Sequence, residues 1–335
     1  MKTRFQKNST NYIRIHISTA SCFLKALMSA FQNSELMAMA APETSFQSAV
    51  LPLVEGRLYA LQNSFALGGR ASAYPANAEG YSVCNCYLLK EGNRAVLLDS
   101  GLTVHADSLI SQVASLIDPG TRLSVYPLRI NEFMSVANVE ALADAFDVEQ
   151  CYSSNADAAV WVDFGARSDK PGAKVSPLVT TMVKRSQRLH VGDEARGRAL
   201  EAFQAPIRLI GTRWIYDEMT RTLFTSDSFS WEWSQSADGP WFLDDATCNT
   251  TAAHVRSFLL NTRYWWLEGG DTESLRRKLK LVFDQYDIEN LAPGYGRVLR
   301  GRDLVKRQYQ LLDQVLTGLD KSVVQARYID RDEIR

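Results

Sequence analysis

The stretch Leu223-Phe224-Thr225-Ser226-Asp227 reads as a buried strand that ends in a carboxylate. Its aspartate suits a metal site, because carboxylates are common ligands of divalent metals. The chain contains only four histidines, however, and lacks those that such a site would need. Two further segments frame the stretch, residues 85–101 and Leu291-Ala292-Pro293-Gly294-Tyr295-Gly296. Together the three segments indicate a scaffold for a metal site whose chemistry has been removed or changed.

The composition indicates a globular chain with a large core. Its 335 residues are 46% hydrophobic, which suffices for one large α/β domain or two smaller ones. The 37 basic and 38 acidic residues leave a net charge of −1, so no overall field attracts nucleic acid or an anionic membrane. We therefore expect neither of these partners, although a local basic pocket is compatible with the composition.

Cysteine usage favours a reducing compartment, and we expect a cytoplasmic protein. The five cysteines are an odd number without a repeated spacing, which argues against a disulfide framework. Cys84 and Cys86 alternate along a strand-like segment and so point to the same side of it. One pair at this spacing is a weak metal signal, and ordinary buried thiols explain it.

Residues 1–50 differ from the rest of the chain, and we predict a disordered N-terminal extension followed by a single domain over residues 51–335. The extension has no acidic residue before Glu35, and its apolar run over residues 20–31 is interrupted by Lys25 and Ser29. Neither a signal peptide nor a membrane span fits this pattern. An amphipathic presequence, or a later start at Met28, Met37 or Met39, is compatible with it.

From Glu55 onward, strand-like alternation and helical spacing succeed each other. Both halves contain strands followed by helices, which favours an α/β fold of two mixed sheets covered by helices. The predicted strands cover residues 56–61, 82–89, 95–98, 123–130, 187–190, 200–210, 214–216 and 222–225. The predicted helices cover residues 105–117, 135–146, 272–284 and 303–317.

With these segments in this order, the chain resembles the metallo-β-lactamase superfamily over roughly residues 55–310, most closely the oxygen-binding diiron branch found in flavodiiron proteins. The resemblance implies a four-layer αββα sandwich of two mixed β-sheets flanked by helices. It places Asp227 at the bridging aspartate of the metal pair, and residues 292–296 at a turn that reads Ala-Pro-x-His-Gly in the family. No flavodoxin segment is expected, so we do not expect electron transfer through an internal flavin.

The resemblance also implies that most metal ligands are absent. In the family's first ligand cluster, Arg129 replaces a histidine and Asn131 a second ligand, while Phe133 and Met134 replace an aspartate and the last histidine. Two later histidines correspond to Arg208 and Tyr295. Guanidinium, phenyl and thioether groups are poor ligands for hard or borderline divalent metals. We therefore expect no metal cofactor.

Charge compensation suggests what replaces the metals. Burying Asp227 without a cation is costly. We therefore predict that Arg129 and Arg208 pair with Asp227 and that Tyr295 donates a hydrogen bond to it.

The alternative is a single divalent metal held by Asp227, Glu132 and in some arrangements Asn131. Such an all-oxygen site suits magnesium or calcium better than iron or zinc. Relocated histidine ligands are not expected, because the four histidines read as surface or capping residues: His16, His105, His190 and His254.

The sequence thus favours a pseudoenzyme, a non-metal binding or partner subunit. Its arginine-lined groove would take an anionic small molecule, and it would form a homodimer or pair with an active relative. The alternative is a hydrolase or an oxidoreductase-like enzyme with altered chemistry, either metal-independent or using a metal at Asp227 and Glu132. The tryptophan-rich segments around Trp231, Trp241 and Trp265 are predicted mainly to pack in the core or at a subunit interface, and the alternative is that they line a pocket or a partner surface. The candidate site residues are Arg129, Asn131, Glu132, Arg208, Asp227 and Tyr295.

Overall fold

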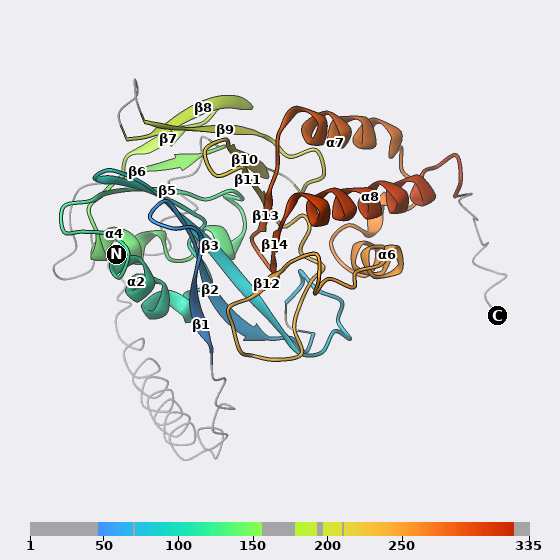
Figure 1. Ribbon diagram of the computed structural model, residues 1–335, viewed down its shortest axis with the longest axis horizontal. Helices are drawn as coiled ribbons and strands as arrows, with labels where there is room; N and C mark the ends of the chain where they lie inside the picture. Colours follow the sequence, from blue (N-terminus) through green and yellow to red (C-terminus); the bar gives the residue numbers. More distant parts are fainter. Residues whose placement is uncertain (1–45, 70, 156–177, 193–196, 210, 325–335) are drawn as a thin grey trace, which may run out of the picture. The chain divides into compact units, whose positions relative to one another are not determined.

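The computed structural model describes residues 46–69, 71–155, 178–192, 197–209 and 211–324. Two seven-stranded sheets form the centre of this part of the chain (Figure 1). Strand β1 begins at Ser48, so the folded chain starts slightly before the predicted boundary at residue 51. Residues 1–45 of the predicted extension lie outside the described residues.

The first sheet follows chain order from β1 to β7. Its first four strands are antiparallel neighbours, and β4 to β7 run parallel. The strands are β1 (Ser48–Val54), β2 (Leu58–Ala66), β3 (Tyr81–Glu91), β4 (Arg94–Leu98), β5 (Arg122–Tyr126), β6 (Val148–Ser153) and β7 (Thr180–Met182).

The second sheet has the order β12-β14-β13-β11-β10-β9-β8. It is also mixed, because β11 pairs in parallel with β13 while β10 pairs antiparallel with β9 and β11. The strands are β8 (Ser186–Val191), β9 (Arg198–Gln204), β10 (Arg213–Asp217), β11 (Thr222–Ser226), β12 (Phe242–Leu243), β13 (Asn290–Pro293) and β14 (Val298–Arg300).

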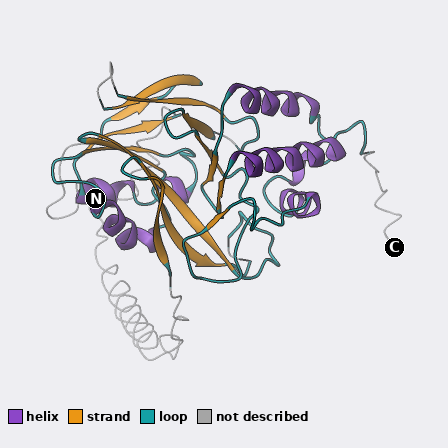
Figure 2. Ribbon diagram, in the orientation of Figure 1, coloured by secondary structure: helices purple, strands orange, loops and turns teal. Residues whose placement is uncertain are grey.

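Helices lie on the outer sides of the two sheets (Figure 2). They are η2 (Thr103–His105), α2 (Ala106–Ala114), α3 (Phe133–Val136), α4 (Val139–Ala145), α6 (Ala252–Leu260), η4 (Trp265–Leu267), α7 (Glu273–Gln285) and α8 (Arg302–Leu319). Within the described residues, no helix is both long enough and apolar enough to span a membrane.

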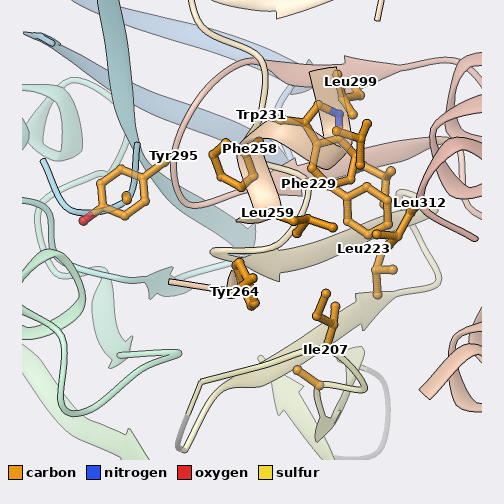
Figure 3. Packing of buried hydrophobic residues seen from close by; sticks show 14 of the residues in the cluster. Ile207, Leu223, Phe229, Trp231, Phe258, Leu259, Tyr264, Tyr295, Leu299 and Leu312 are labelled. Carbon is orange, nitrogen blue, oxygen red and sulfur yellow. The ribbon is translucent and has the colours of Figure 1, made fainter. Parts of the chain in front are cut away.

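Three apolar clusters separate the layers. One lies between the first sheet and helices α2 and α4, and another lies between the two sheets. The third packs α6, α7 and α8 against the second sheet and contains many aromatic rings (Figure 3). Alternation along β11 is typical: Leu223 faces the helices and Phe224 faces the other sheet. The predicted four-layer αββα sandwich is therefore confirmed.

The helix predicted over residues 135–146 is divided into α3 and α4 at Asn138. The Asn138 side-chain amide donates to the carbonyl oxygens of Ser100 and Leu102, at 2.8 and 2.9 Å. Its backbone N–H bonds to the Ser100 hydroxyl at 3.1 Å rather than to a helical carbonyl. These bonds tie the break to the loop after β4, because the Ser100 hydroxyl takes the place of a helical carbonyl as the acceptor for the Asn138 N–H.

Candidate functional site

The candidate site lies where strands from both sheets end. Because β11 and β13 are parallel and adjacent, their carboxyl ends lie side by side, with Ser226 opposite Pro293. The Gly294 N–H donates to the Ser226 carbonyl oxygen at 2.5 Å. Asp227 follows Ser226 directly and Tyr295 follows Gly294, so both lie just beyond the ends of these two strands. Arg129 approaches them from the first sheet, in the segment that follows β5.

Met134 closes this junction against Gly294. A Cβ atom at Gly294 would lie 3.0 Å from the Met134 methyl carbon and 3.2 Å from the Ser226 carbonyl oxygen, so a side chain there requires something to shift. Met134 is fully buried. Two of the positions that the resemblance assigned to lost histidines, Met134 and Tyr295, therefore lie near the end of β11.

Arg129 and Asp227 form a buried ion pair. The Arg129 Nη1 atom is 3.5 Å from Asp227 Oδ2, and the two side chains are 0% and 4% exposed. Charge-assisted hydrogen bonds between such groups are shorter, about 2.7–2.9 Å. Within the described residues, no nitrogen of the guanidinium and neither carboxylate oxygen makes a hydrogen bond. The contact is thus one of charge, and the predicted Arg129–Asp227 pair is present.

Tyr295 contributes its ring rather than its hydroxyl. The centre of the Arg129 guanidinium lies 5.4 Å from the Tyr295 ring centroid, within the range of a cation–π contact. Phe65 and Tyr74 pack edge-on against the same ring, with centroids 6.0 and 6.4 Å away, and fix its plane. Among the hydrogen bonds of the described residues, none joins Tyr295 to Asp227, so the predicted bond was wrong.

The charges around Arg129 favour its protonated form. Burial alone lowers the pKa of Arg129, but the nearby Asp227 carboxylate, with Tyr295 and Asp99, more than offsets this effect and raises it. Asp99 accepts a 2.8 Å hydrogen bond from the Leu128 N–H and so holds the segment that carries Arg129. Burial raises the pKa of Asp99 to about 6, although Arg129 and the Leu128 amide act in the opposite direction.

Tyr264 also borders the site, although no sequence pattern selects it. It is 2% exposed, and its hydroxyl makes no hydrogen bond among the described residues. Burial and the Asp227 carboxylate both raise its pKa. It belongs to the same apolar cluster as Phe258 and Leu259 of α6 (Figure 3). Its position in an aromatic segment predicted only packing, so its proximity to Asp227 became visible only in three dimensions.

Glu132 lies at the rim and is already paired. The Arg263 Nη1 atom donates to Glu132 Oε1 at 2.7 Å, and the Arg263 Nη2 atom donates to the Ser72 hydroxyl at 2.8 Å. Asn131 is exposed, and Phe133 is 70% exposed. In the part of the chain that the structure describes, no three His, Cys, Asp or Glu side chains are grouped so that they could hold a metal ion. The geometry therefore does not favour the alternative site of Glu132, Asn131 and Asp227.

Arg208 does not reach Asp227, contrary to the prediction. Its Nη1 atom donates to the Ala205 carbonyl oxygen at 2.9 Å. With the Gln204 amide oriented so that its oxygen faces the guanidinium, this oxygen accepts from Arg208 Nε and Nη2 at 3.1 Å each. Asp227 is not among its ion-pair partners in the described residues. The Arg208 guanidinium is thus held by oxygens of Gln204 and Ala205, close to it in the sequence, and not by Asp227.

The histidines divide between the predicted roles and others. His254 caps α6 together with Thr251, as predicted. His105 is 2% exposed, with its Nε2 atom 3.1 Å from the Ser64 carbonyl oxygen, so the prediction of a surface residue was wrong for it. It lies in η2, a turn that packs back onto β2. His190 is half-buried, and His16 lies outside the described residues.

The cysteines and tryptophans behave largely as core residues. Cys84 and Cys86 are each 1% exposed and free. Contact with the Cys86 thiol lowers the pKa of Cys84 to about 6, and His105 acts in the same direction against burial. Trp231 and Trp241 are buried. Trp265 and its neighbour Trp266 are 67% and 46% exposed, so this pair does not pack in the core, and its place at a subunit interface stays a prediction.

Comparisons with known proteins identify the fold. No protein-family model and no curated protein matches this chain. Rubredoxin oxygen:oxidoreductase from Desulfovibrio gigas superposes with a TM-score of 0.59 at 17% identity, covering 80% of this chain and 62% of that one. The flavodiiron protein from Giardia intestinalis gives 0.57 at 15% identity, covering 81% and 60%. A fragment of a putative diflavin flavoprotein from Nostoc gives 0.57 at 14% identity, covering 81% and 97%.

These likenesses show the fold alone, namely the metallo-β-lactamase-like fold of the flavodiiron proteins, as the sequence resemblance predicted. The present chain spans only about three fifths of the length of the first two structures. An iron pair at the end of β11 would need several donor atoms with lone pairs around Asp227. The groups in contact with this carboxylate instead include a guanidinium, which has none to offer. The residues present therefore do not fit an iron centre.

Proposed function

We propose that this chain, which has the metallo-β-lactamase-like fold of the flavodiiron proteins, works without metal as a binding protein or partner subunit. The observation that carries the proposal is the buried contact between Arg129 and Asp227, 3.5 Å apart. A guanidinium in contact with the bridging carboxylate supplies a positive charge where the fold otherwise places cations. It also blocks that carboxylate from acting as a ligand.

The charge of the site supports this reading. Asp227 carries one negative charge, and Arg129 supplies one permanent positive charge at the same depth. The ring of Tyr295 covers the guanidinium from another side. Because unpaired buried charges are strongly destabilising, removing either partner would leave the other charge uncompensated and destabilise the fold. Asp227 and Arg129 therefore neutralise each other within the fold, without a bound cation.

We further propose that this chain binds an anionic small molecule near the candidate site. Arg129 is fully buried and already paired, so it has no free charge to offer. Arg208 is half-buried, and its only hydrogen bonds among the described residues go to carbonyl and amide oxygens of its own connection. No acidic side chain of the described residues pairs with Arg208, so the anion is expected at Arg208 rather than at Arg129.

A second subunit is also proposed, either another copy of this chain or an active relative. Trp265 and Trp266 support this proposal, since exposed aromatic side chains are enriched at interfaces. Analytical ultracentrifugation of the purified chain tests the homodimer. If the mass stays that of a monomer at all concentrations, the homodimer is excluded and a relative is the remaining partner. Binding of such a relative should then be lost when Trp265 and Trp266 are replaced by alanine.

Metal analysis tests the central proposal. The chain is expressed with iron, zinc and manganese supplied, purified without chelators and analysed by mass spectrometry of the elements. Less than about a tenth of an equivalent of any metal is expected, because a site without a suitable donor set binds weakly. Asp227→Ala is compared with Asp118→Ala, which removes an exposed aspartate in a turn. Stoichiometric metal that is lost only in Asp227→Ala refutes the proposal.

A further inference from the structure

Two arginines of the β9–β10 hairpin lie near the Arg129–Asp227 pair. Arg208 lies in the connection between β9 and β10, and Arg213 is the first residue of β10. Neither has an acidic partner within 4.0 Å among the described residues, whereas Arg198 on the same hairpin is paired with Asp217. The two arginines therefore bring two positive charges to one end of the second sheet without a visible counter-charge.

The backbone fixes both arginines in place. Gln204 at the end of β9 pairs with Arg213 at the start of β10. The amide oxygen of Gln204 faces the Arg208 guanidinium, and the Ala205 carbonyl oxygen accepts from its Nη1 atom at 2.9 Å. The Arg213 N–H donates to the Leu128 carbonyl oxygen at 3.0 Å, next to Arg129. The hairpin is thus joined to the segment after β5 at this point.

Two buried donor atoms here, Arg213 Nε and the Tyr126 hydroxyl oxygen, have no acceptor for their hydrogens among the described residues. Arg213 is 6% exposed, and its Nε atom makes no hydrogen bond among the described residues. Tyr126, at the end of β5, is fully buried and its hydroxyl likewise makes none. Burial raises the pKa of Tyr126, and Arg213 opposes this rise, so the phenol and the guanidinium are close neighbours. Buried polar groups in proteins are normally paired, which points to an acceptor supplied from outside the chain.

The electrostatics of Arg208 agree with this requirement. Burial lowers its pKa, and the positive charges of Arg213 and Arg185 lower it further. Like charges held this close repel each other. A bound anion would relieve that repulsion and the cost of burial together. The Arg129 site differs, because its own carboxylate already provides the compensation.

We infer that Arg208 and Arg213, with the Tyr126 hydroxyl, form a binding site for a small molecule that carries a phosphate group. The inference rests on the proposed function, in which the anion binds away from Arg129. Guanidinium groups bind phosphate oxygens through paired N–H donors. A phosphate group offers three acceptor oxygens and close to two negative charges, which match two arginines and one hydroxyl donor. A monocarboxylate matches only one of the two charges.

Calorimetric titration with inorganic phosphate at constant ionic strength tests the inference, and acetate serves as the monocarboxylate probe. The variants are Arg208→Gln, Arg213→Gln and Tyr126→Phe, which remove single groups with little change in size. Arg277→Gln is the matched control, because Arg277 is an exposed arginine of α7 whose side chain is 71% accessible. Circular dichroism and the thermal transition of each variant confirm that it is folded.

Saturable phosphate binding is expected in the wild type and in Arg277→Gln. Its dissociation constant should rise about tenfold or more in each arginine variant, as for loss of a charge-assisted hydrogen bond. Tyr126→Phe should weaken binding less, and acetate should bind far more weakly than phosphate. Arg208 is only half-buried, so Arg208→Gln is expected to fold. This variant alone can test the inference if Arg213→Gln fails to fold. Equal phosphate affinity in Arg208→Gln and the control, or no binding to the folded wild type, overturns the inference.

The metal analysis separates this result from the proposed function. Metal bound through Asp227 together with arginine-dependent phosphate binding would refute the metal-free site and leave the phosphate site standing. A metal-free chain whose phosphate affinity does not depend on Arg208 or Arg213 would support the metal-free site and refute the phosphate site. Acetate binding as tight as phosphate binding would replace the phosphate class with carboxylates and so overturn the inference.

Discussion

The guanidinium of Arg129 lies 3.5 Å from the carboxylate of Asp227, and both side chains are almost completely buried. One comes from the end of β5 in the first sheet and the other from the end of β11 in the second. The pair therefore joins the two sheets at the point where β11 ends. Its contribution to stability depends on both charges, because a lone buried charge is far more costly than a matched pair.

Asp227→Asn is expected to destabilise the chain strongly. The substitution keeps the size of the side chain but leaves Arg129 charged and uncompensated. Removing one partner of a buried ion pair typically costs about 3–5 kcal/mol. Urea unfolding measures the loss, with Asp118→Asn as a control for an exposed aspartate. A loss no larger than that of the control would show that Arg129 finds another counter-charge.

Tyr295 should act through its ring. Tyr295→Phe keeps the ring that faces Arg129, and we expect it to change the free energy of unfolding by less than about 1 kcal/mol. Tyr295→Leu removes the cation–π contact and two aromatic contacts, and should cost about 2 kcal/mol or more. Both are measured by urea unfolding. If the phenylalanine variant is as unstable as the leucine variant, the hydroxyl has a role that the ring contact does not explain.

Asp99 should make stability depend on pH in the acidic range. Burial raises its pKa from 3.8 to about 6 in the folded chain, so the folded state binds more protons than the unfolded state between these values. The contribution is fully present below the unfolded pKa and is lost as the pH rises through the folded pKa. A shift of about two pKa units corresponds to about 3 kcal/mol.

Urea unfolding of wild type and Asp99→Asn across this range measures the effect of Asp99. The wild type should lose stability relative to the variant as the pH rises from about 4 to about 6, and the difference should be constant above that. Asparagine keeps an oxygen that can accept from the Leu128 N–H, so the comparison isolates the charge. Parallel pH profiles for the two proteins would contradict the assignment.

Glu132 should matter much less than Asp227. Its ion pair with Arg263 is partly accessible, with side chains 22% and 20% exposed, so solvent screens the charge left by Glu132→Gln. We expect a loss of about 1 kcal/mol in the free energy of unfolding. The same urea experiment serves, with Arg263→Gln as the partner variant. A loss as large as that of Asp227→Asn would place Glu132 in the buried charge network.

Sequence patterns carried the framework of the site because they act locally. The alternation in β11 and the proline-glycine turn after β13 specify where two strands end, and parallel pairing places these two ends side by side, with Ser226 opposite Pro293. Arg129 was selected by the resemblance to the diiron proteins, in which a histidine stands at this position, and not by the strand pattern. Burial of a carboxylate at a strand end requires a positive charge, so the ion pair could be predicted before its geometry was known.

Other contacts depend on residues that are distant in sequence or on the path of a single connection. Glu132 binds Arg263, which is far along the chain and shows no sequence signal for this pairing. Arg208 is held by Ala205 and Gln204 because the connection between β9 and β10 turns back on itself. Its backbone path decides where the guanidinium lies, and residue type alone does not report that path.

A double-mutant cycle on Arg129 and Asp227 tests the central claim most directly. The free energies of unfolding of wild type, Arg129→Met, Asp227→Asn and the double variant are measured in urea. If the two side chains compensate each other in place of metal ions, the double variant will be more stable than the sum of the single effects predicts, by about 2 kcal/mol or more. Effects that add within about 0.5 kcal/mol would show that the two charges do not depend on each other, and would contradict the account.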